Sequence, residues 1–151
     1  TRFDCDWSSD VCSSDLDCSI ALAWYFADEA DPYADAVQDG LANAPAAVPS
    51  LWPLELANAL VMGERRGRST PAQASAWLSL LRLLPIHVDG ETESRAWTDT
   101  LHLARAHGLT SYDASYLELA LRLGVPIATF DAKLKAAATA VGVPSYRPPA
   151  P

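Results

Sequence analysis

Apolar and polar residues follow two different spacings along the chain. Apolar residues at intervals of three and four predict helices over 22–26, 31–41, 54–66, 69–81, 92–107, 112–123 and 132–140. Between them lie short apolar runs at 46–49, 86–88 and 125–130, with a further strand candidate at 143–146. Short strands separated by helices of about 10 to 15 residues are typical of βαβ units. We therefore predict a three-layer α/β/α fold with a short, mostly parallel sheet.

Turn and capping residues support these boundaries. Thr70 and Pro71 supply a capping hydroxyl and a first-turn proline, which favour the start of a helix. Gly67, Gly108 and Gly124 each follow a helical stretch, where glycine commonly ends a helix. The chain has neither an internal repeat nor a linker. We predict one domain over residues 17–147 and a proline-rich tail at 148–151.

Residues 1–16 do not share this pattern. They hold two of the three cysteines and a self-similar serine- and aspartate-rich string at 8–15. We interpret them as a disordered polar tail or as a non-native segment, because residues 6–16 (DWSSDVCSSDL) match the translation of a common sequencing adapter. They lack the basic start and apolar middle of a signal peptide. Sequencing the genomic DNA upstream of Asp17 tests the adapter hypothesis.

Composition and charge narrow the function classes. The 151 residues are 50% apolar, which suffices for a packed core and excludes disordered and disulfide-scaffold classes. The net charge is −8, and it becomes −5 without residues 1–16 because these carry four acids and one base. Either value disfavours non-specific adhesion to nucleic acid. Charged residues or proline interrupt every apolar run before the roughly 18 residues of a membrane span, so we expect a soluble protein without a membrane partner.

Cysteine usage bears on the compartment. Outside residues 1–16, Cys18 is the only cysteine. A single thiol forms no disulfide framework and suits a reducing, cytoplasmic location. We do not expect Cys18 to act as a nucleophile, because no nearby segment offers a paired histidine.

Four carboxylates stand where a predicted strand gives way to a helix. Asp17 and Asp131 precede helices, and Glu55 and Asp113 fall in first helical turns. In an open parallel sheet, ligands bind in the crevice at the carboxyl ends of the strands. The predicted topology therefore brings all four acids into one cleft.

Each acid also has an ordinary structural interpretation. Asp17 and Asp131 suit helix N-caps, which stabilise a helix by about 1 kcal/mol each. Thr110 and Asp113 have nearly the spacing of a capping box, and Glu55 complements a helix dipole. These interpretations stay open for each acid taken alone. Only the convergence of all four favours a site.

Carboxylates held together repel one another unless a cation neutralises them. Hard oxygen ligands and retained water describe a Mg²⁺ or Mn²⁺ site. Asn58 lies one helical turn after Glu55, and Ser19 lies two residues after Asp17, so both are candidate accessory groups. A surface amide and an ordinary turn bond remain the alternatives for these two. No zinc-ligand spacing connects the three histidines, His87, His102 and His107.

Four motifs carry these acids in a fixed order. They are LDCSIALAW (16–24), VPSLWPLELANAL (48–60), LTSYDASY (109–116) and IATFD (127–131). Together they resemble, in order and spacing, the PIN-domain ribonucleases, and among these most closely the VapC-type toxins of bacterial toxin–antitoxin pairs. The resemblance extends over nearly all of residues 17–143.

This resemblance implies a PIN-like fold and a Mg²⁺- or Mn²⁺-dependent endoribonuclease. Its catalytic and metal-binding quartet would be Asp17, Glu55, Asp113 and Asp131, and its accessory residues would be Ser19, Asn58 and Thr129. It also implies that the protein is the toxin of a type II toxin–antitoxin system. The expected partners are the RNA substrate, a cognate antitoxin and a second copy of the chain.

An acidic protein that binds RNA needs local positive charge. The candidates for phosphate contacts are Arg65, Arg66, Arg68, Lys133 and Lys135. For the arginines we favour the alternative of solvated helix ends, because cations suit helix C-termini. Three aromatic residues could dock a partner, although core packing is the preferred interpretation for each: Trp24, Tyr25 and Trp52.

One departure from the family pattern concerns the first strand. PIN proteins have an apolar strand before the first aspartate, and here residues 11–16 read VCSSDL. If that strand is replaced, the sheet loses a buried member and Asp17 is poorly held. This keeps open an inactive PIN-fold interaction module. Two further alternatives are a receiver-like Mg²⁺-binding phosphoacceptor domain and a phosphatase of the haloacid dehalogenase type.

Overall fold

The computed structural model describes residues 12–150, and its centre is a sheet of four short strands. All strand pairs are parallel, and the strand order is β3-β2-β1-β4. The strands are β1 (Ser14–Leu16), β2 (Ala46–Val48), β3 (Ile86–Val88) and β4 (Ile127–Ala128). Every connection between neighbouring parallel strands must cross over through helices. The short parallel sheet predicted from the sequence is confirmed.

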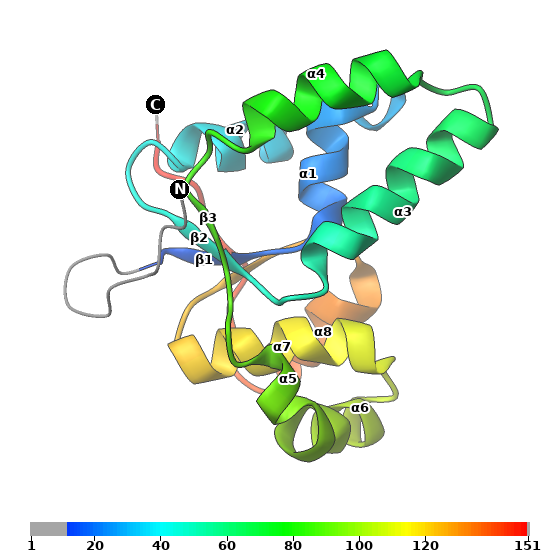
Figure 1. Ribbon diagram of the computed structural model, residues 1–151. Coiled ribbons are helices and arrows are strands. Elements are labelled where there is room, and N and C mark those ends of the chain that lie inside the picture. Colours follow the sequence, from blue (N-terminus) through cyan, green and yellow to red (C-terminus); the bar gives the residue numbers. More distant parts are fainter. Residues whose placement is uncertain (1–11, 151) are drawn as a thin grey trace.

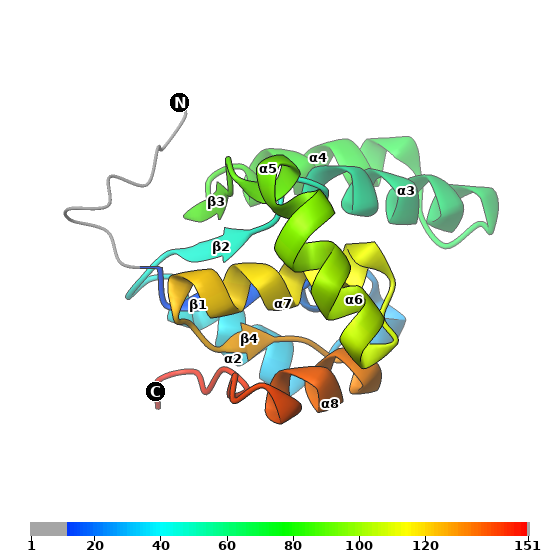
Figure 2. The same ribbon diagram turned by 90° about the horizontal axis from the view of Figure 1, so that it is seen from below.

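Helices cover both faces of this sheet (Figure 1). On one side lie α1 (Cys18–Tyr25), η1 (Ala27–Glu29), α2 (Pro32–Gly40), α3 (Trp52–Arg65) and α4 (Pro71–Leu81). On the other side lie α5 (Thr92–Arg95), η2 (Ala96–Thr100), α6 (Leu101–His107) and α7 (Ser111–Leu123). Figure 2 shows α7 across the sheet, with α8 (Ala132–Ala140) beside it. The three-layer α/β/α fold is therefore confirmed.

Capping residues and glycines start or end several helices where the sequence predicts. Thr70 and Gln73 form a reciprocal capping box, and Pro71 occupies the first turn of α4. Gly108 and Gly124 end α6 and α7 with φ of 63° and 67°, in the left-handed region that favours glycine.

Several elements differ from the prediction, and the helix expected over 22–26 begins earlier, at Cys18. The helix expected over 92–107 contains a π-helical turn, η2, between α5 and α6. The strand expected at 143–146 is reduced to one parallel bridge between Ile127 and Ser145. The Ile127 N–H donates to the Pro144 carbonyl at 3.0 Å, and the Tyr146 N–H donates to the Ile127 carbonyl at 2.8 Å. The segment thus covers the open edge of β4 without extending the sheet further.

The folded domain begins before residue 17, which corrects the predicted boundary. β1 lies between β2 and β4, with Ser14 opposite Ala46 and Asp15 opposite Ile127. The condition under which the sheet would lose a member is not met: β1 pairs on both edges through its backbone, which does not require apolar side chains, and Leu16 is fully buried. Residues 1–11 lie outside the described part of the chain. The adapter origin of this segment stays a prediction.

Asp15 is an acidic residue buried in the central strand β1. Its side chain is 0% exposed, and neither carboxyl oxygen has a hydrogen-bond partner. Burial raises the pKa of Asp15 well above its usual range, and the neighbouring Asp17, Asp89 and Glu118 raise it further. An unpaired buried carboxyl destabilises the folded state, so β1 is retained despite this residue.

The core fills both interfaces between sheet and helices. Its largest fully buried side chains include Leu16, Ile20, Leu117, Ile127 and Leu134. None of the helices in the described part has both the length and the apolar character needed to cross a bilayer.

The aromatic residues considered for partner docking pack internally. The Trp24 indole N–H donates to the Ala34 carbonyl at 2.7 Å, and the Tyr25 ring stacks on Trp77 with centroids 4.8 Å apart. Trp52 is buried. Core packing, the preferred interpretation for these residues, is confirmed.

Candidate metal centre

A cleft lies at the carboxyl ends of β1 and β4. Asp17 directly follows β1, and its backbone N–H donates to the Ala128 carbonyl at 2.9 Å, which joins the two strand ends. The cleft has a volume of about 510 Å³. Its lining residues are Asp17, Cys18, Ser19, Leu22, Glu55, Asn58, Asp113, Phe130 and Asp131. The structure thus brings all four predicted carboxylates to one cleft, together with Ser19 and Asn58.

Two hydroxyls hold the carboxylate of Asp17. Ser19 Oγ donates to Asp17 Oδ2 at 2.7 Å, and Thr129 Oγ1 donates to the same oxygen at 2.6 Å. Thr129 is buried and sits directly after β4. Because both bonds converge on one oxygen, they set the direction of the whole carboxylate group. Ser19 and Thr129 are therefore positioning residues for Asp17.

The same hydroxyls also fix the loop after β4. Ser19 Oγ accepts a hydrogen bond from the Phe130 N–H at 3.1 Å, and Thr129 Oγ1 accepts one from the Asp131 N–H at 3.0 Å. Each hydroxyl donates to Asp17 and accepts from this loop. The position of Asp131 is thus coupled to that of Asp17.

Glu55 enters the cleft from the first turn of α3. The buried Tyr116, on α7, donates its hydroxyl to Glu55 Oε1 at 2.6 Å. This bond reaches from one side of the sheet to the other. Tyr116 belongs to the third motif, and its position in the sequence does not by itself indicate this contact. An aromatic residue one turn after Asp113 on the same helix was the only available signal.

Asp113 and Asp131 sit at helix starts, as their capping interpretations require. The Asp113 N–H donates to Thr110 Oγ1 at 3.1 Å, so Thr110 caps α7. The Leu134 N–H donates to Asp131 Oδ1 at 2.8 Å, so Asp131 caps α8. Asp17 occupies the cap position of α1 without a side-chain capping bond. Capping therefore accounts for Asp131 in part and leaves Asp17 and Asp113 available for other ligands.

The electrostatics of the cleft oppose the ionisation of three carboxyls. Burial is the largest cause that raises the pKa of Asp17, Glu55 and Asp113. Neighbouring negative charge adds to it, since Asp131 raises the pKa of Asp17 and of Asp113. The hydrogen bond from Tyr116 acts in the opposite direction on Glu55. A bound cation would oppose this repulsion and favour the ionised carboxylates.

The donor set fits a hard divalent cation. Carboxylate oxygens with a neighbouring amide and hydroxyl are the ligands that Mg²⁺ and Mn²⁺ prefer. Within residues 12–150, no three histidine, cysteine or carboxylate side chains converge on one point closely enough to hold an ion as they stand. Asp113 is half-buried and Asp131 is exposed, so these two side chains have room to turn, whereas Tyr116 holds the carboxylate of Glu55.

The predicted phosphate contacts lie outside the lining of the cleft. Arg65 and Arg66 are at the end of α3, about two turns beyond the cleft residue Asn58. Arg68 pairs with Asp28 at 2.8 Å and with Glu29 at 3.2 Å. Lys133 and Lys135 are exposed on α8, and of these two Lys133 lowers the pKa of Asp113. None of these five candidates is among the residues that line the described cleft.

Cys18 lines the cleft but is poorly suited to reaction. It is buried, and both burial and the charge of Glu55 raise the pKa of its thiol. Since the thiolate is the reactive form, this environment suppresses nucleophilic chemistry at Cys18.

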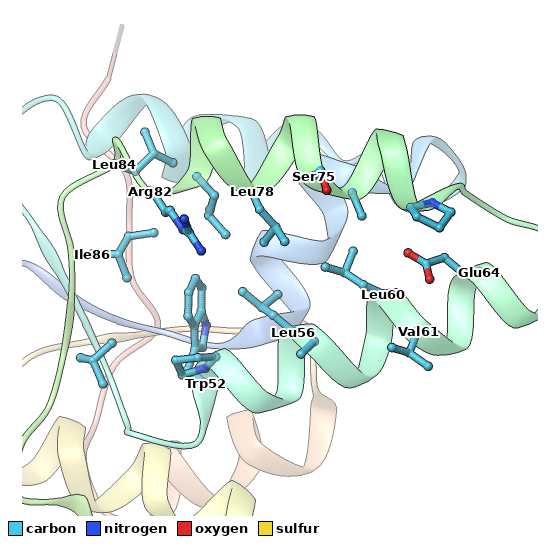
Figure 3. Close-up of a pocket in the computed structure, with 16 residues that line it drawn as sticks. Trp52, Leu56, Leu60, Val61, Glu64, Ser75, Leu78, Arg82, Leu84 and Ile86 are labelled. Atoms are coloured by element: carbon cyan, nitrogen blue, oxygen red, sulfur yellow. The ribbon is translucent and has the colours of Figure 1, made fainter.

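A separate apolar groove lies along the other face of α3. Figure 3 shows Trp52, Leu56 and Leu60 of α3 facing Leu78 of α4. The groove has a volume of about 650 Å³, and Val61 and Val88 at its margin are 41% and 51% exposed. α3 therefore contributes to the acidic cleft with Glu55 and to the apolar groove with Leu56.

Comparison with known proteins relates this geometry to a family. The family model described as PIN domain matches residues 16–140. The crystal structure of PAE2754 from Pyrobaculum aerophilum is similar, with a TM-score of 0.63 and 27% sequence identity over 91% of this chain and 88% of that chain. No curated protein matches the sequence. The matched segment contains all four cleft carboxylates.

Proposed function

Because this chain belongs to the PIN-domain family, whose members are generally nucleases, we propose that it is a Mg²⁺- or Mn²⁺-dependent endoribonuclease. One observation carries the proposal: Asp17, Glu55, Asp113 and Asp131 come from four separate segments and line one cleft. Such a cluster is costly for stability without a cation. The family match gives no support to the receiver-like and haloacid dehalogenase-type alternatives.

We assign Asp17 and Asp113 as direct ligands of the ion. Asp17 is the most fixed of the four, since the hydroxyls of Ser19 and Thr129 both hold its Oδ2. Glu55 and Asp131 either hold a second ion or orient the attacking water. When bound, the ion supplies Lewis acidity toward the phosphate and the water.

The remaining residues of the cleft prepare these ligands. Tyr116 donates to Oε1 of Glu55, which orients this carboxylate and favours its ionised form. Asn58 lines the cleft and can donate an amide N–H to a substrate oxygen. The hydroxyls of Ser19 and Thr129 hold Asp17 and the loop that carries Asp131 in a fixed position relative to each other. Cleavage is expected to leave a 5′-phosphate and a 3′-hydroxyl.

A cleavage assay tests this function. Purified protein is incubated with a labelled RNA in Mn²⁺ or Mg²⁺, and the same reaction is run with Asp113→Asn and with EDTA. Metal-dependent cutting by the native chain that the variant loses supports the proposal. Asp39→Asn, an exposed acid at the end of α2, is the matched control and should cut normally. Unchanged cutting by Asp113→Asn contradicts the assigned site.

We also propose that the enzyme is the toxin of a type II toxin–antitoxin system and acts in the cytoplasm. The groove between α3 and α4 supports a protein partner, because apolar patches left at a surface commonly mark interfaces. We assign this groove to a second copy of the chain and the margin of the acidic cleft to the antitoxin. A small gene for a DNA-binding protein directly upstream would support the toxin role.

Size-exclusion chromatography with light scattering tests the proposed dimer separately. The native chain should elute as a dimer, and Val61→Glu at the exposed margin of the groove should elute as a monomer with unchanged circular dichroism. A monomeric native chain would contradict this assignment and leave the nuclease proposal intact.

The buried Asp15 favours one alternative, an inactive PIN fold that serves as an interaction module. Asp15 lies two residues before Asp17, and its unpaired carboxyl weakens the strand that positions the site. If the native chain does not cut RNA but Asp15→Val does, Asp15 has inactivated a nuclease. If neither cuts, the interaction module is favoured.

A further inference from the structure

Phe130 is an aromatic residue placed inside the acidic cleft. It stands between Thr129 and Asp131, lines the cleft and is 36% exposed. We propose that the Phe130 ring is a stacking surface for one unpaired RNA base beside the phosphate to be cut. The inference rests on the proposed nuclease function, and it assigns the contact that orients the substrate.

The ring is held in place before any substrate arrives. The Phe130 N–H donates to Ser19 Oγ at 3.1 Å, so its backbone is tied to the residue that positions Asp17. The Tyr33 ring packs against Phe130 edge to face, with centroids 5.9 Å apart and planes at 68°. The Tyr33 hydroxyl in turn donates to the Tyr146 carbonyl at 2.7 Å. A ring fixed at both backbone and edge loses little freedom when a base stacks on it.

The charge of the cleft favours a contact that does not depend on positively charged side chains. Four carboxylates line the cleft, and the described residues that line it include no lysine or arginine. Arg68 is paired with Asp28 and Glu29, and Lys133, which lowers the pKa of Asp113, acts from outside the lining. Phosphate contacts, which dominate the affinity of most nucleic-acid-binding proteins, are therefore sparse beside the reacting group. Base stacking on an aromatic ring supplies affinity that does not depend on positive charge.

A stacking contact with Phe130 requires an unpaired base in the RNA. A base in an A-form duplex is already stacked between its neighbours and is not available to a protein ring. A base in a loop or a single strand can turn out and lie on Phe130. The ring therefore favours cleavage at unpaired positions and tolerates any base, because every base has a π face.

Binding to a fluorescent RNA tests the proposal. The probe is a single-stranded oligonucleotide with 2-aminopurine beside the cleavage position, and the protein is the full chain carrying Asp113→Asn, in Mg²⁺, so that the probe is not cut. Phe130→Leu in this chain retains an apolar contact with Tyr33 but removes the aromatic face. We expect affinity to fall by about 5- to 100-fold and the fluorescence change to disappear. Phe130→Trp should retain both.

The matched control is Trp97→Ala. Trp97 is 90% exposed on η2 and lies outside the cleft lining, so its loss should leave RNA binding unchanged. Thermal unfolding of each variant should stay close to that of the parent, because Phe130 is partly exposed. Equal affinity of Phe130→Leu and the parent, or no binding by the parent at all, overturns the proposal. Equal affinity would indicate that the Phe130 ring contacts a protein partner instead of RNA.

Cleavage by the otherwise native chain separates this inference from the proposed function. If Phe130→Leu raises KM for a single-stranded RNA at least fivefold and leaves the weaker cutting of a duplex unchanged, stacking is supported. If the variant cuts with native KM, stacking fails and the nuclease function stands. If the native chain cuts nothing but the probe still binds through Phe130, the nuclease function fails and the stacking surface stands.

Discussion

Thr129 donates a hydrogen bond of 2.6 Å to Oδ2 of Asp17, although the two residues are 112 positions apart in the chain. The register of the sheet makes this contact possible, because Leu16 lies opposite Ala128 and each residue is followed by one partner of the bond. A slip of one residue between β1 and β4 would turn Thr129 to the other face. The site therefore depends on correct pairing of the central strand.

Thr129→Val tests this coupling. Valine has nearly the shape of threonine but cannot donate to Asp17 or accept from the Asp131 N–H. We expect metal affinity and cleavage to fall by about 10- to 100-fold, as for other groups that orient a metal ligand. Thr139→Val is the control, because Thr139 is exposed on α8 and its hydroxyl donates to the Lys135 carbonyl, outside the cleft. Rates within twofold of native in Thr129→Val would contradict the role.

Tyr116→Phe removes the hydroxyl that holds Glu55. The ring stays buried, so the free energy of unfolding should change by no more than about 1.5 kcal/mol. Cleavage should fall about tenfold, because Glu55 loses its orientation and its pKa rises further. Tyr25→Phe, which loses a hydroxyl without a hydrogen-bond partner outside the cleft lining, should retain native cleavage. The pair is compared in the same assay, and equal rates for both variants would argue against Glu55 as part of the site.

Asp15→Val should stabilise the protein. The substitution replaces an unpaired buried carboxyl in β1 with an apolar side chain that suits a central strand. We expect the free energy of unfolding in urea at pH 7 to rise by about 1 to 3 kcal/mol. The exposed Asp39→Ala should change it by less than about 0.5 kcal/mol. A destabilised Asp15→Val variant would mean that the carboxyl has a partner in solution.

The stabilisation by Asp15→Val should depend on pH. The pKa of Asp15 is raised in the folded state, so the folded protein keeps this proton to a higher pH than the unfolded chain does. As the pH rises above about 4, the unfolded chain ionises first, and the native protein loses stability relative to the variant. The difference between the two should be smallest below pH 4 and largest near neutrality. A difference that shrinks with rising pH would contradict the assigned shift.

The architecture was predictable because most of it follows from local patterns. Helical spacing, the capping box at Thr70 and the terminal glycines are short-range signals, and the structure retains them. β1 could not be predicted, since Ser14 and Asp15 have neither β-propensity nor an apolar pattern. Its backbone pairs on both edges with β2 and β4, and this tertiary context outweighs local preference.

The four carboxylates of the cleft could be predicted from the sequence, but the side-chain contacts that hold them could not. The position of Asp17, Glu55, Asp113 and Asp131 at strand ends and helix starts is visible in the sequence, and the parallel topology brings them together. The bond between Tyr116 and Glu55 spans 61 positions and depends on how α3 and α7 face each other across the sheet. The absence of arginines from the described cleft lining likewise depends on where the end of α3 projects. Such long-range packing leaves no mark on the local pattern.

Binding of Mn²⁺ to the metal-free chain tests the central claim most directly. The electron paramagnetic resonance signal of free Mn²⁺ is titrated with the native protein, with Asp113→Asn and with the exposed control Asp39→Asn. We predict that the native chain and Asp39→Asn remove one or two equivalents of Mn²⁺ from the free signal, and that Asp113→Asn binds at least tenfold more weakly. Equal binding by all three proteins, or none by the native chain, would contradict a metal site built from these carboxylates.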